Sequence, residues 1–523
     1  MEQAPQRSAV TGRALLLGLC LSLLLCGVTP YNDFKIGATY LAGNHLPIAS
    51  FFVLLLLVLG PNALLRRLRP TLALAPGELL TIWAMCAVSS GLPSSALCRY
   101  LIPHIIAGLQ FATPENGWAE SILTHLPPAL QIQDPDAVRF FFDGLWGRGQ
   151  IPWHLWFRPL LVYSVFCLAL FVAFACLSVL LRREWVEHER FTFPLAQLPV
   201  ELMDAPADGQ LWPPLLRHRG MWAVVFILTV IHTLNGLHRI YAAVPEVNLA
   251  QWRFQGIGSR GWRMLNGTWM YVYPLAIGFS YLINNEVLLS LWLFHLLYKG
   301  TLIGADFLGI TPQRVGTSGY GFETFASQEA AGAALALTIW MVWSGRQQFA
   351  AVARRALGRC GPLPGEREEG LPYGVAFWGL LLSLGVMFVW LVRFGGSVAM
   401  AAGVLLFAFV SFITLTWLVA QAGLLFVQPV WAGRELMVRL FGSGGFTPRA
   451  ILVNAEVEHI YALDLREFVL PHIMNVQKAG DAFGTSPPRV ARRDDAGAAR
   501  RHAGLDLRQR PAALRSRGPR GAE

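Results

Sequence analysis

The sequence predicts an all-α fold, a polytopic bundle of about ten transmembrane helices. Of its 523 residues, 54% are hydrophobic and only 14% are charged, which is more apolar than a soluble domain needs. The apolar residues form continuous runs such as 159–181, whereas the strands of a β-barrel would alternate over segments of about ten residues. Because backbone groups in hydrocarbon must be hydrogen-bonded internally, long apolar runs form helices.

The net charge of +10 does not indicate a nucleic-acid partner. Ten arginines against three aspartates and one glutamate lie within residues 484–523, and most of the other charges lie in short loops between apolar runs. Basic residues in short loops set the orientation of membrane spans. We therefore expect the lipid bilayer to be the main partner, in the cell membrane, and no nucleic acid.

The first two spans follow from basic flanks. Arg7 and Arg13 precede an apolar run at 14–28, and a second run at 47–65 ends in the basic cluster 66–69. Since basic short loops remain in the cytoplasm, the N-terminus is expected there. The first run also has the length of a signal-peptide core, but no small-residue cleavage site follows it cleanly, so a retained span is predicted.

The third span is predicted to be broken. It begins well at Pro76 and Glu78, and the apolar pattern resumes at 101–109. Residues 89–95 (Ser-Ser-Gly-Leu-Pro-Ser-Ser) interrupt the pattern, and four of them are candidates for a substrate or ion pathway: Ser89, Ser90, Gly91 and Pro93. Such a break frees backbone groups at membrane depth, where they can bind an ion or a substrate. A simple kink is the alternative.

The next elements are an external segment and two spans joined by a cytoplasmic loop. Residues 113–158 contain several tryptophans and prolines, a composition that suits the lipid headgroup layer. A span at 159–181 then ends at a charged cytoplasmic loop, and a further span is predicted at 221–237.

The apolar stretch 269–309 presents an ambiguity. A single helix of about 40 residues would be about 60 Å long, twice the thickness of the bilayer core. The polar triplet Asn284, Asn285 and Glu286 divides the stretch, which favours a helical hairpin or re-entrant segment with arms at 269–283 and 287–303. The triplet is a second candidate for the substrate or ion pathway, because polar groups at membrane depth are usually functional. A solvated turn is the alternative.

Three further spans complete the predicted bundle, at 327–343, 371–392 and 398–418. The first ends at several arginines, and an even number of crossings before it would put them in the cytoplasm, which supports the hairpin. An amphipathic region then continues to residue 483. We therefore expect an integral membrane domain at 1–483.

A basic tail at 484–523 is compositionally foreign to the rest, being rich in Arg, Ala, Gly and Pro. Disorder is the ordinary expectation for such a segment. A tail attracted to anionic lipid is an alternative. Out-of-frame translation of GC-rich DNA would also produce this composition, and the native chain would then continue with further spans.

No metal or cofactor is predicted. The seven cysteines include no CxxC pair, and no HExxH motif or GxSxG elbow is present. These absences predict no catalytic residues, so an enzyme is the less favoured class.

Two segments carry a family resemblance. Residues 189–196 (Glu-Arg-Phe-Thr-Phe-Pro-Leu-Ala) and 276–284 (Ala-Ile-Gly-Phe-Ser-Tyr-Leu-Ile-Asn), the latter continuing to 289–290, resemble stretches of the oligopeptide transporter superfamily and its yellow-stripe-like relatives. The likeness is closer to an uncharacterised set of prokaryotic membrane proteins distantly related to those transporters. The resemblance implies a secondary, cation-coupled transporter of peptides or metal chelates.

The leading functional hypothesis is such a transporter, with a small-molecule or peptide substrate and a path through the broken span and the hairpin. A membrane-embedded enzyme or cell-envelope assembly factor acting on lipid-linked material is the alternative, because the Trp-rich external loops at 113–158 and 244–267 exceed what a minimal transporter needs. A structural subunit of a larger complex is a third hypothesis, and a homo-oligomer is compatible with all three.

Overall fold

The computed structural model describes residues 10–483, apart from 38, 146–149, 208, 248, 250, 311–313, 316–321 and 367. The described chain is helical almost throughout, which confirms the all-α prediction. Its strands form two short antiparallel pairs, β1 (Gln251–Arg253) with β2 (Trp269–Tyr271) and β3 (Arg314–Val315) with β4 (Phe322–Glu323). The predicted tail at 484–523 lies outside the described residues.

Eight helical segments of the described chain are long and apolar enough to cross a membrane. They are formed by α1 (Gly12–Pro30), α2 (Ile48–Leu57) with α3 (Ala63–Leu68), α7 (Trp153–Arg183), α10 (Arg219–His238), α12 (Asn285–Phe307), α13 (Thr324–Ser344), α15 (Tyr373–Gly395) and α16 (Val398–Ala422). The protein is therefore a multi-pass membrane protein.

Two further pairs of shorter helices are each separated by a non-helical break. The first pair is α4 (Pro76–Ser89) and α5 (Cys98–Gln110), which confirms the predicted break in the third span. The second pair, α18 (Pro448–Tyr461) and α19 (Val469–Ala482), lies in the region for which the sequence predicts only amphipathic character. The two helices of each pair would extend over about 40 Å if they were laid end to end at 1.5 Å per residue.

The remaining helices connect these elements. They are α6 (Pro135–Asp143), α8 (Pro194–Met203), α9 (Pro214–Arg217), α11 (Pro274–Ser280), α14 (Arg346–Ala356) and α17 (Gly433–Phe441).

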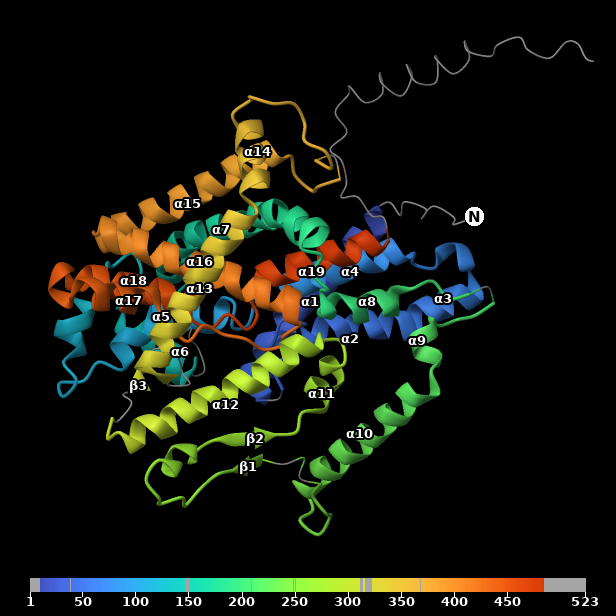
Figure 1. Ribbon diagram of the computed structural model, residues 1–523, viewed down its shortest axis with the longest axis horizontal. Coiled ribbons are helices and arrows are strands. Elements are labelled where there is room, and N and C mark those ends of the chain that lie inside the picture. Colours follow the sequence, from blue (N-terminus) through green and yellow to red (C-terminus); the bar gives the residue numbers. More distant parts are fainter. Residues whose placement is uncertain are drawn as a thin grey trace, which may run out of the picture.

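The centre of the bundle is formed by α7, α15, α16 and the two broken helices (Figure 1). On α15, the Trp390 indole packs against Tyr163 and Phe166 of α7, and its Nε1 donates to the Val162 carbonyl oxygen at 2.9 Å. Close packing of this kind stabilises helix pairs in lipid, where burial of apolar surface gives little driving force. This centre holds the broken helices in place.

Arginines gather at one end of the bundle. Arg13 at the start of α1 pairs with Glu78 at the start of α4, with Nη2 and Oε2 2.6 Å apart. At the end of α7, Arg182 pairs with Glu369 before α15, at 2.9 Å, and with Asp481 at the end of α19. The first contact joins the starts of α1 and α4, and the other two join the end of α7, the start of α15 and the end of α19. The two groups are linked by the packing of α4 against α19. The arginines expected in the cytoplasm at the starts and ends of these helices thus share one end.

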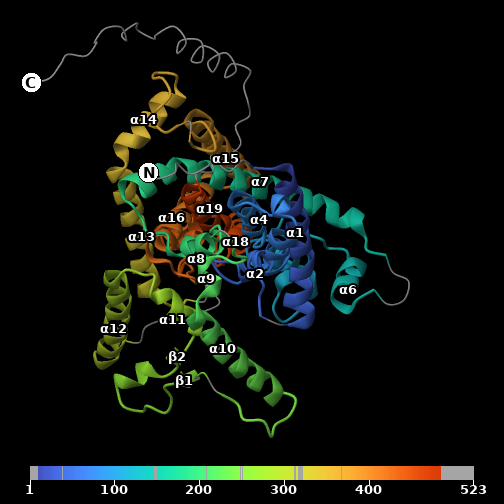
Figure 2. The same cartoon turned by 90° about the vertical axis from the view of Figure 1, so that its right-hand side faces the viewer.

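A peripheral arm, defined here as residues 219–310, stands apart from the bundle (Figures 1 and 2). It contains α10, the β1–β2 pair, α11 and α12. All 20 residues of α10 are at least partly exposed. Since this helix is strongly apolar, lipid or another apolar surface must surround it.

The predicted hairpin in this arm needs correction. Its second half is helical, as α12, but its first half, 269–283, contains the strand β2 and the 7-residue helix α11. A helix of that length spans about 10 Å, too short to cross the bilayer. Trp269 stacks on Tyr271, and Tyr271 on Tyr273, along an extended segment paired with β1. Hydropathy does not distinguish such a segment from a helix.

Candidate functional site at the paired breaks

The two broken helices pack against each other in opposite directions. α4 contacts α19, and α5 contacts α18. In Figure 1, α4 and α19 occupy the right half of the bundle, and α5 and α18 the left half. The two breaks, 90–97 and 462–468, therefore meet near the middle of the bundle. Paired broken helices at this depth bring helix ends and unpaired backbone groups together around a substrate or ion site.

Glu467, in the second break, accepts three hydrogen bonds, two from the first break and one from the loop before α2. Its side chain is fully buried. Oε1 accepts from the backbone N–H of Gly43 at 2.6 Å and from the Ser94 hydroxyl at 3.5 Å, and Oε2 accepts from the backbone N–H of Ser95 at 2.9 Å. The carboxylate thus lies close to the start of α5, where the helix dipole favours negative charge.

Gly91 permits the breaks to approach each other. A Cβ atom added here would lie 2.5 Å from the Glu467 carbonyl oxygen. Only a residue without a side chain fits this contact. Of the four residues predicted for the first break, Gly91 is therefore the one in closest contact with the second.

The two predicted serines lie at the break but bond within their own helix. The Ser89 hydroxyl donates to the Cys86 carbonyl oxygen at 3.3 Å, and the Ser90 hydroxyl to that of Ala87 at 2.9 Å. Pro93 is buried in the same turn. The hydrogen bonds to the second break are made by Ser94 and Ser95, which lie within the predicted interruption but were not among its candidate pathway residues.

Two arginines converge on Ser95. Nη1 of Arg99 and Nη2 of Arg466 each lie 3.3 Å from the Ser95 Oγ. Both guanidinium groups also lie over the Tyr40 ring, at 4.0 and 6.0 Å from its centroid. Arginine recognises carboxylate and phosphate groups through paired N–H donors. Two positively charged side chains at the breaks thus contact the same hydroxyl oxygen, that of Ser95.

Acidic groups balance these arginines. Asp33 lies 3.5 Å from Arg99, and Asp464 accepts from Nε of Arg466 at 2.7 Å. Asp464 also accepts from the Tyr100 hydroxyl at 2.5 Å and from the Gln428 amide. Buried charges are tolerated in a membrane protein when they are paired in this way. We call Asp33, Ser95, Arg99, Asp464, Arg466 and Glu467 the break cluster.

The sequence does contain a signal for the second broken helix. Residues 101–105 read Leu-Ile-Pro-His-Ile, and residues 469–473 read Val-Leu-Pro-His-Ile. These similar segments lie in the second half of each broken helix, α5 and α19. Their similarity indicates an internal repeat. From the sequence alone, it would have predicted that residues 462–473 belong to a second broken helix like the first.

The triplet Asn284, Asn285 and Glu286 lies elsewhere. Its three residues are exposed at the start of α12, in the peripheral arm, whereas the break cluster is in the bundle. Glu286 in a first helical turn interacts favourably with the helix dipole. The structure therefore does not join the two halves of the predicted pathway, and the solvated-turn alternative fits this position.

The external tryptophans differ in their environments. Trp153 is 66% exposed, whereas Trp156 is 8% exposed and belongs to the hydrophobic core. Of these two, only Trp153 is thus available to an external ligand in this structure. Within the described residues, no group of three His, Cys, Asp or Glu side chains is placed to hold a metal ion.

Comparison with known proteins gives one match. A sequence model described as "Family of unknown function (DUF6785)" matches residues 4–492. No curated protein and no solved structure matches the chain. The matched region includes both broken helices and the whole break cluster.

Proposed function

The chain belongs to the DUF6785 family of unknown function, and we propose that it is a cation-coupled secondary transporter of a small solute. The observation that carries this proposal is the antiparallel pair of broken helices, whose breaks meet at the break cluster. Transporters use such pairs to bind substrate and ion near the bilayer midplane.

The solute that the break cluster favours carries a carboxylate. The guanidinium groups of Arg99 and Arg466 both reach Ser95. Guanidinium groups bind planar anions such as carboxylates through paired N–H donors. The resemblance to oligopeptide transporters suggests peptides or metal chelates, and both classes carry carboxylates. In this proposal, Asp33 and Asp464 release the arginines when the solute binds.

Transport by purified protein in proteoliposomes tests the proposal. The solutes are a labelled dipeptide, a labelled tripeptide and the nickel–histidine chelate, each offered under an imposed proton or sodium gradient. Wild-type protein is expected to accumulate at least one of them only when a gradient is present. No gradient-dependent accumulation of any of the three would contradict the proposal.

A serine pair provides a matched test of the site. Ser95→Ala removes the hydroxyl to which both arginines donate. A hydrogen bond to a charged group contributes about 1.5–3 kcal/mol. We therefore expect the rate of uptake to fall roughly tenfold or more. Ser164→Ala on α7 is the control, because that hydroxyl is exposed and bonds only the Leu160 carbonyl of its own helix. Equal uptake by the two variants would remove the break cluster from the transport path.

A further inference from the structure

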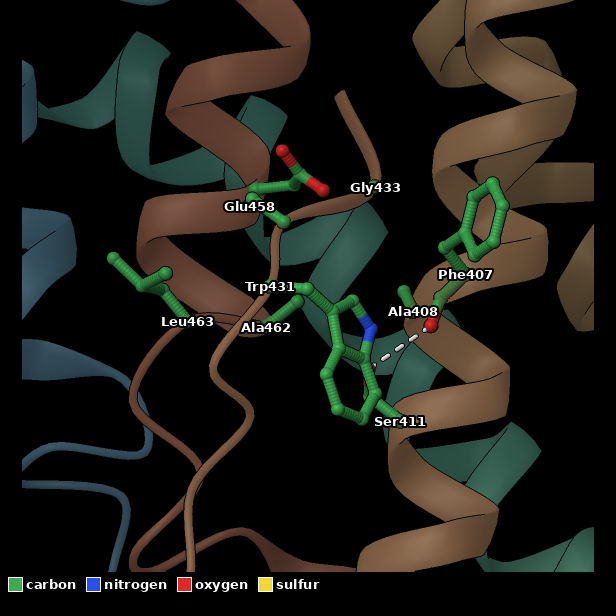
Figure 3. Close-up of a pocket in the computed structure, with 9 residues that line it drawn as sticks. Phe407, Ala408, Ser411, Trp431, Gly433, Glu458, Ala462 and Leu463 are labelled. Carbon is green, nitrogen blue, oxygen red and sulfur yellow. Dashed lines mark hydrogen bonds between the residues drawn. The ribbon is translucent and has the colours of Figure 1, made fainter. Parts of the chain in front are cut away.

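A small pocket lies beside the second break, between α16, α17 and α18. Figure 3 shows the side chains that surround it. Its volume is about 10 Å³, which is enough for one water molecule. The residues that matter for its chemistry are Ser411, Trp431, Gly433 and Glu458.

One carboxylate oxygen of Glu458 accepts no hydrogen bond in this pocket. Its side chain is 6% exposed. Oε1 accepts from the backbone N–H of Arg434 at 3.0 Å, but Oε2 has no hydrogen-bond partner within the described structure. The nearest charged atom is Nε of Arg434, 3.8 Å from Oε2. Nε1 of Trp431, which also lines the pocket, is likewise without a partner there.

These groups suit a water molecule and a proton better than a metal ion. Sodium and divalent cations need several oxygen ligands. Apart from Glu458, the polar side chains of this pocket are the Trp431 indole, which is only a donor, and the Ser411 hydroxyl, which donates to the Phe407 carbonyl oxygen at 3.0 Å. A single water could accept from Trp431 and donate to Oε2.

We propose that Glu458 is the proton-binding site of this protein, loaded through one water molecule in the pocket. The inference deepens the proposed function, on which it rests, by naming the proton as the coupling ion. On loading, the pocket water accepts a proton from solvent and passes one of its own to Oε2, so that an O–H bond forms, the carboxylate is neutralised and the water stays neutral. On unloading, Oε2 returns a proton to the water, which releases one to solvent.

The break cluster is less suited to this role. Both oxygens of Glu467 are hydrogen-bonded, and Asp464 is paired with Arg466 and Tyr100. A proton there would have to displace an existing donor. Glu458, in contrast, has an oxygen that accepts no hydrogen bond and has only a 3.8 Å ion pair with Arg434, so a proton can bind it without displacing a donor.

Protonation would also loosen α17 from α18. The charged carboxylate faces the N-terminus of α17, and a neutral carboxyl interacts less strongly with that helix dipole. Gly433 allows the close approach, since a Cβ atom there would lie 2.9 Å from Oε1 of Glu458 and 2.9 Å from Cβ of Phe407. Proton binding and movement of α17 are therefore coupled.

The surroundings contain few other charges. On α17, Arg434 and Glu435 are the charged groups whose fields reach Glu458. On α18, the titratable neighbours are Glu456, His459 and Tyr461. The adjoining apolar cavity is lined from α7 and α15 by Phe166, Leu170 and Met387. The charge state of Glu458 is thus set mainly by burial, by Arg434 and by the start of α17.

Infrared difference spectroscopy tests the site without a transport assay. Reconstituted protein is cycled between acid and alkaline buffer in H₂O and D₂O, and the carbonyl stretch of protonated carboxyl groups is followed. We expect a pH-dependent, deuterium-sensitive band that is lost in Glu458→Gln. Glu456, on the same helix, is the rival site, because its Oε2 is also buried without a hydrogen bond in the described structure, but it does not line the pocket; Glu456→Gln should keep the Glu458 band. Glu187→Gln is the control, because that side chain is 47% exposed and outside the pocket lining.

Three outcomes would overturn the inference: a band unchanged in Glu458→Gln, a band lost in Glu456→Gln instead, or a band removed by sodium at constant pH. A transport arm uses the solute that wild-type proteoliposomes accumulate. There, Glu458→Gln should abolish proton-driven uptake but keep exchange of labelled for unlabelled solute. If no solute is transported while the Glu458 band is present, the transport proposal fails and the proton site stands.

Discussion

Gly91 and Glu467 join two segments that are far apart in the chain. The Glu467 side chain bonds the first break, while its own carbonyl oxygen lies where a side chain on Gly91 would have to be. Neither residue could be assigned this role from the sequence, because each contact depends on the other break.

Gly91→Ala is expected to destabilise the protein. The added methyl group meets the Glu467 carbonyl oxygen and the Ala96 side chain, and overpacking of this kind typically costs about 1–3 kcal/mol. The measurement is the melting temperature of the purified protein in detergent.

Gly385→Ala is the control for this prediction. Gly385 lies in α15 with nothing within 4 Å of an added Cβ atom. Alanine has a higher helix propensity than glycine, so the melting temperature of the Gly385→Ala variant should be equal to or higher than that of wild type. A Gly91→Ala variant as stable as Gly385→Ala would contradict the contact between the breaks.

At the scale of elements, the junction between α16 and α8 depends on a second glycine. Gly423 ends α16 with φ at +62°, and Phe193 before α8 donates its backbone N–H to the Ala420 carbonyl oxygen at 3.0 Å. An added Cβ atom on Gly423 would lie 2.6 Å from Cβ of Pro194. The Phe-Pro segment noted for its family resemblance is therefore a packing point between two helices.

Gly423→Ala should destabilise the protein more than Gly396→Ala. Both positions end a helix at positive φ, with Gly396 at +77°, so both variants lose about 1–2 kcal/mol for the left-handed backbone. Only Gly423 adds the clash with Pro194, worth about 1–3 kcal/mol more. Melting temperatures of the two variants, measured side by side, check this order. Equal losses would show that α8 shifts freely away from α16.

Element prediction from the sequence succeeded where a helix is long and uniformly apolar. The spans α7, α15 and α16 were found because each presents a continuous apolar run. The segment 269–283 was misassigned because its aromatic residues are as apolar in a strand as in a helix. The α18–α19 pair was missed because buried Asn454 and Glu458 lower its hydropathy, although their polar groups are enclosed by neighbouring helices.

At the scale of the whole molecule, the arginine-rich end of the bundle determines the expected orientation. The helix ends joined by Arg13 and Arg182 lie at this end, and the basic cluster at the end of α3 leads directly into α4. The loop after α5 lies at the other end of the broken helix, whose two parts together are about 40 Å long. From the positive-inside rule we expect the end of α3 in the cytoplasm and this loop outside.

Cysteine labelling tests this orientation. In a background without the seven native cysteines, Glu115→Cys should react with a membrane-impermeant maleimide on intact cells. Arg67→Cys should react only after the cells are permeabilised. The reverse pattern would invert the orientation, and labelling of both from outside would contradict a bundle that spans the membrane along this axis.

By itself, the sequence determined the membrane class, most of the long spans and the first break. These depend on local composition, since hydrocarbon demands long apolar helices and a Ser-Gly-Pro segment interrupts one wherever it lies. Only the tertiary structure decided that a second broken helix lies antiparallel to the first, and that Ser95, Arg99, Arg466 and Glu467 meet there. The physical reason is that a buried charge becomes tolerable at depth only through its partners, and Glu467 and Arg99 find theirs in segments distant in the chain, at Ser94 and Ser95 and at Asp33.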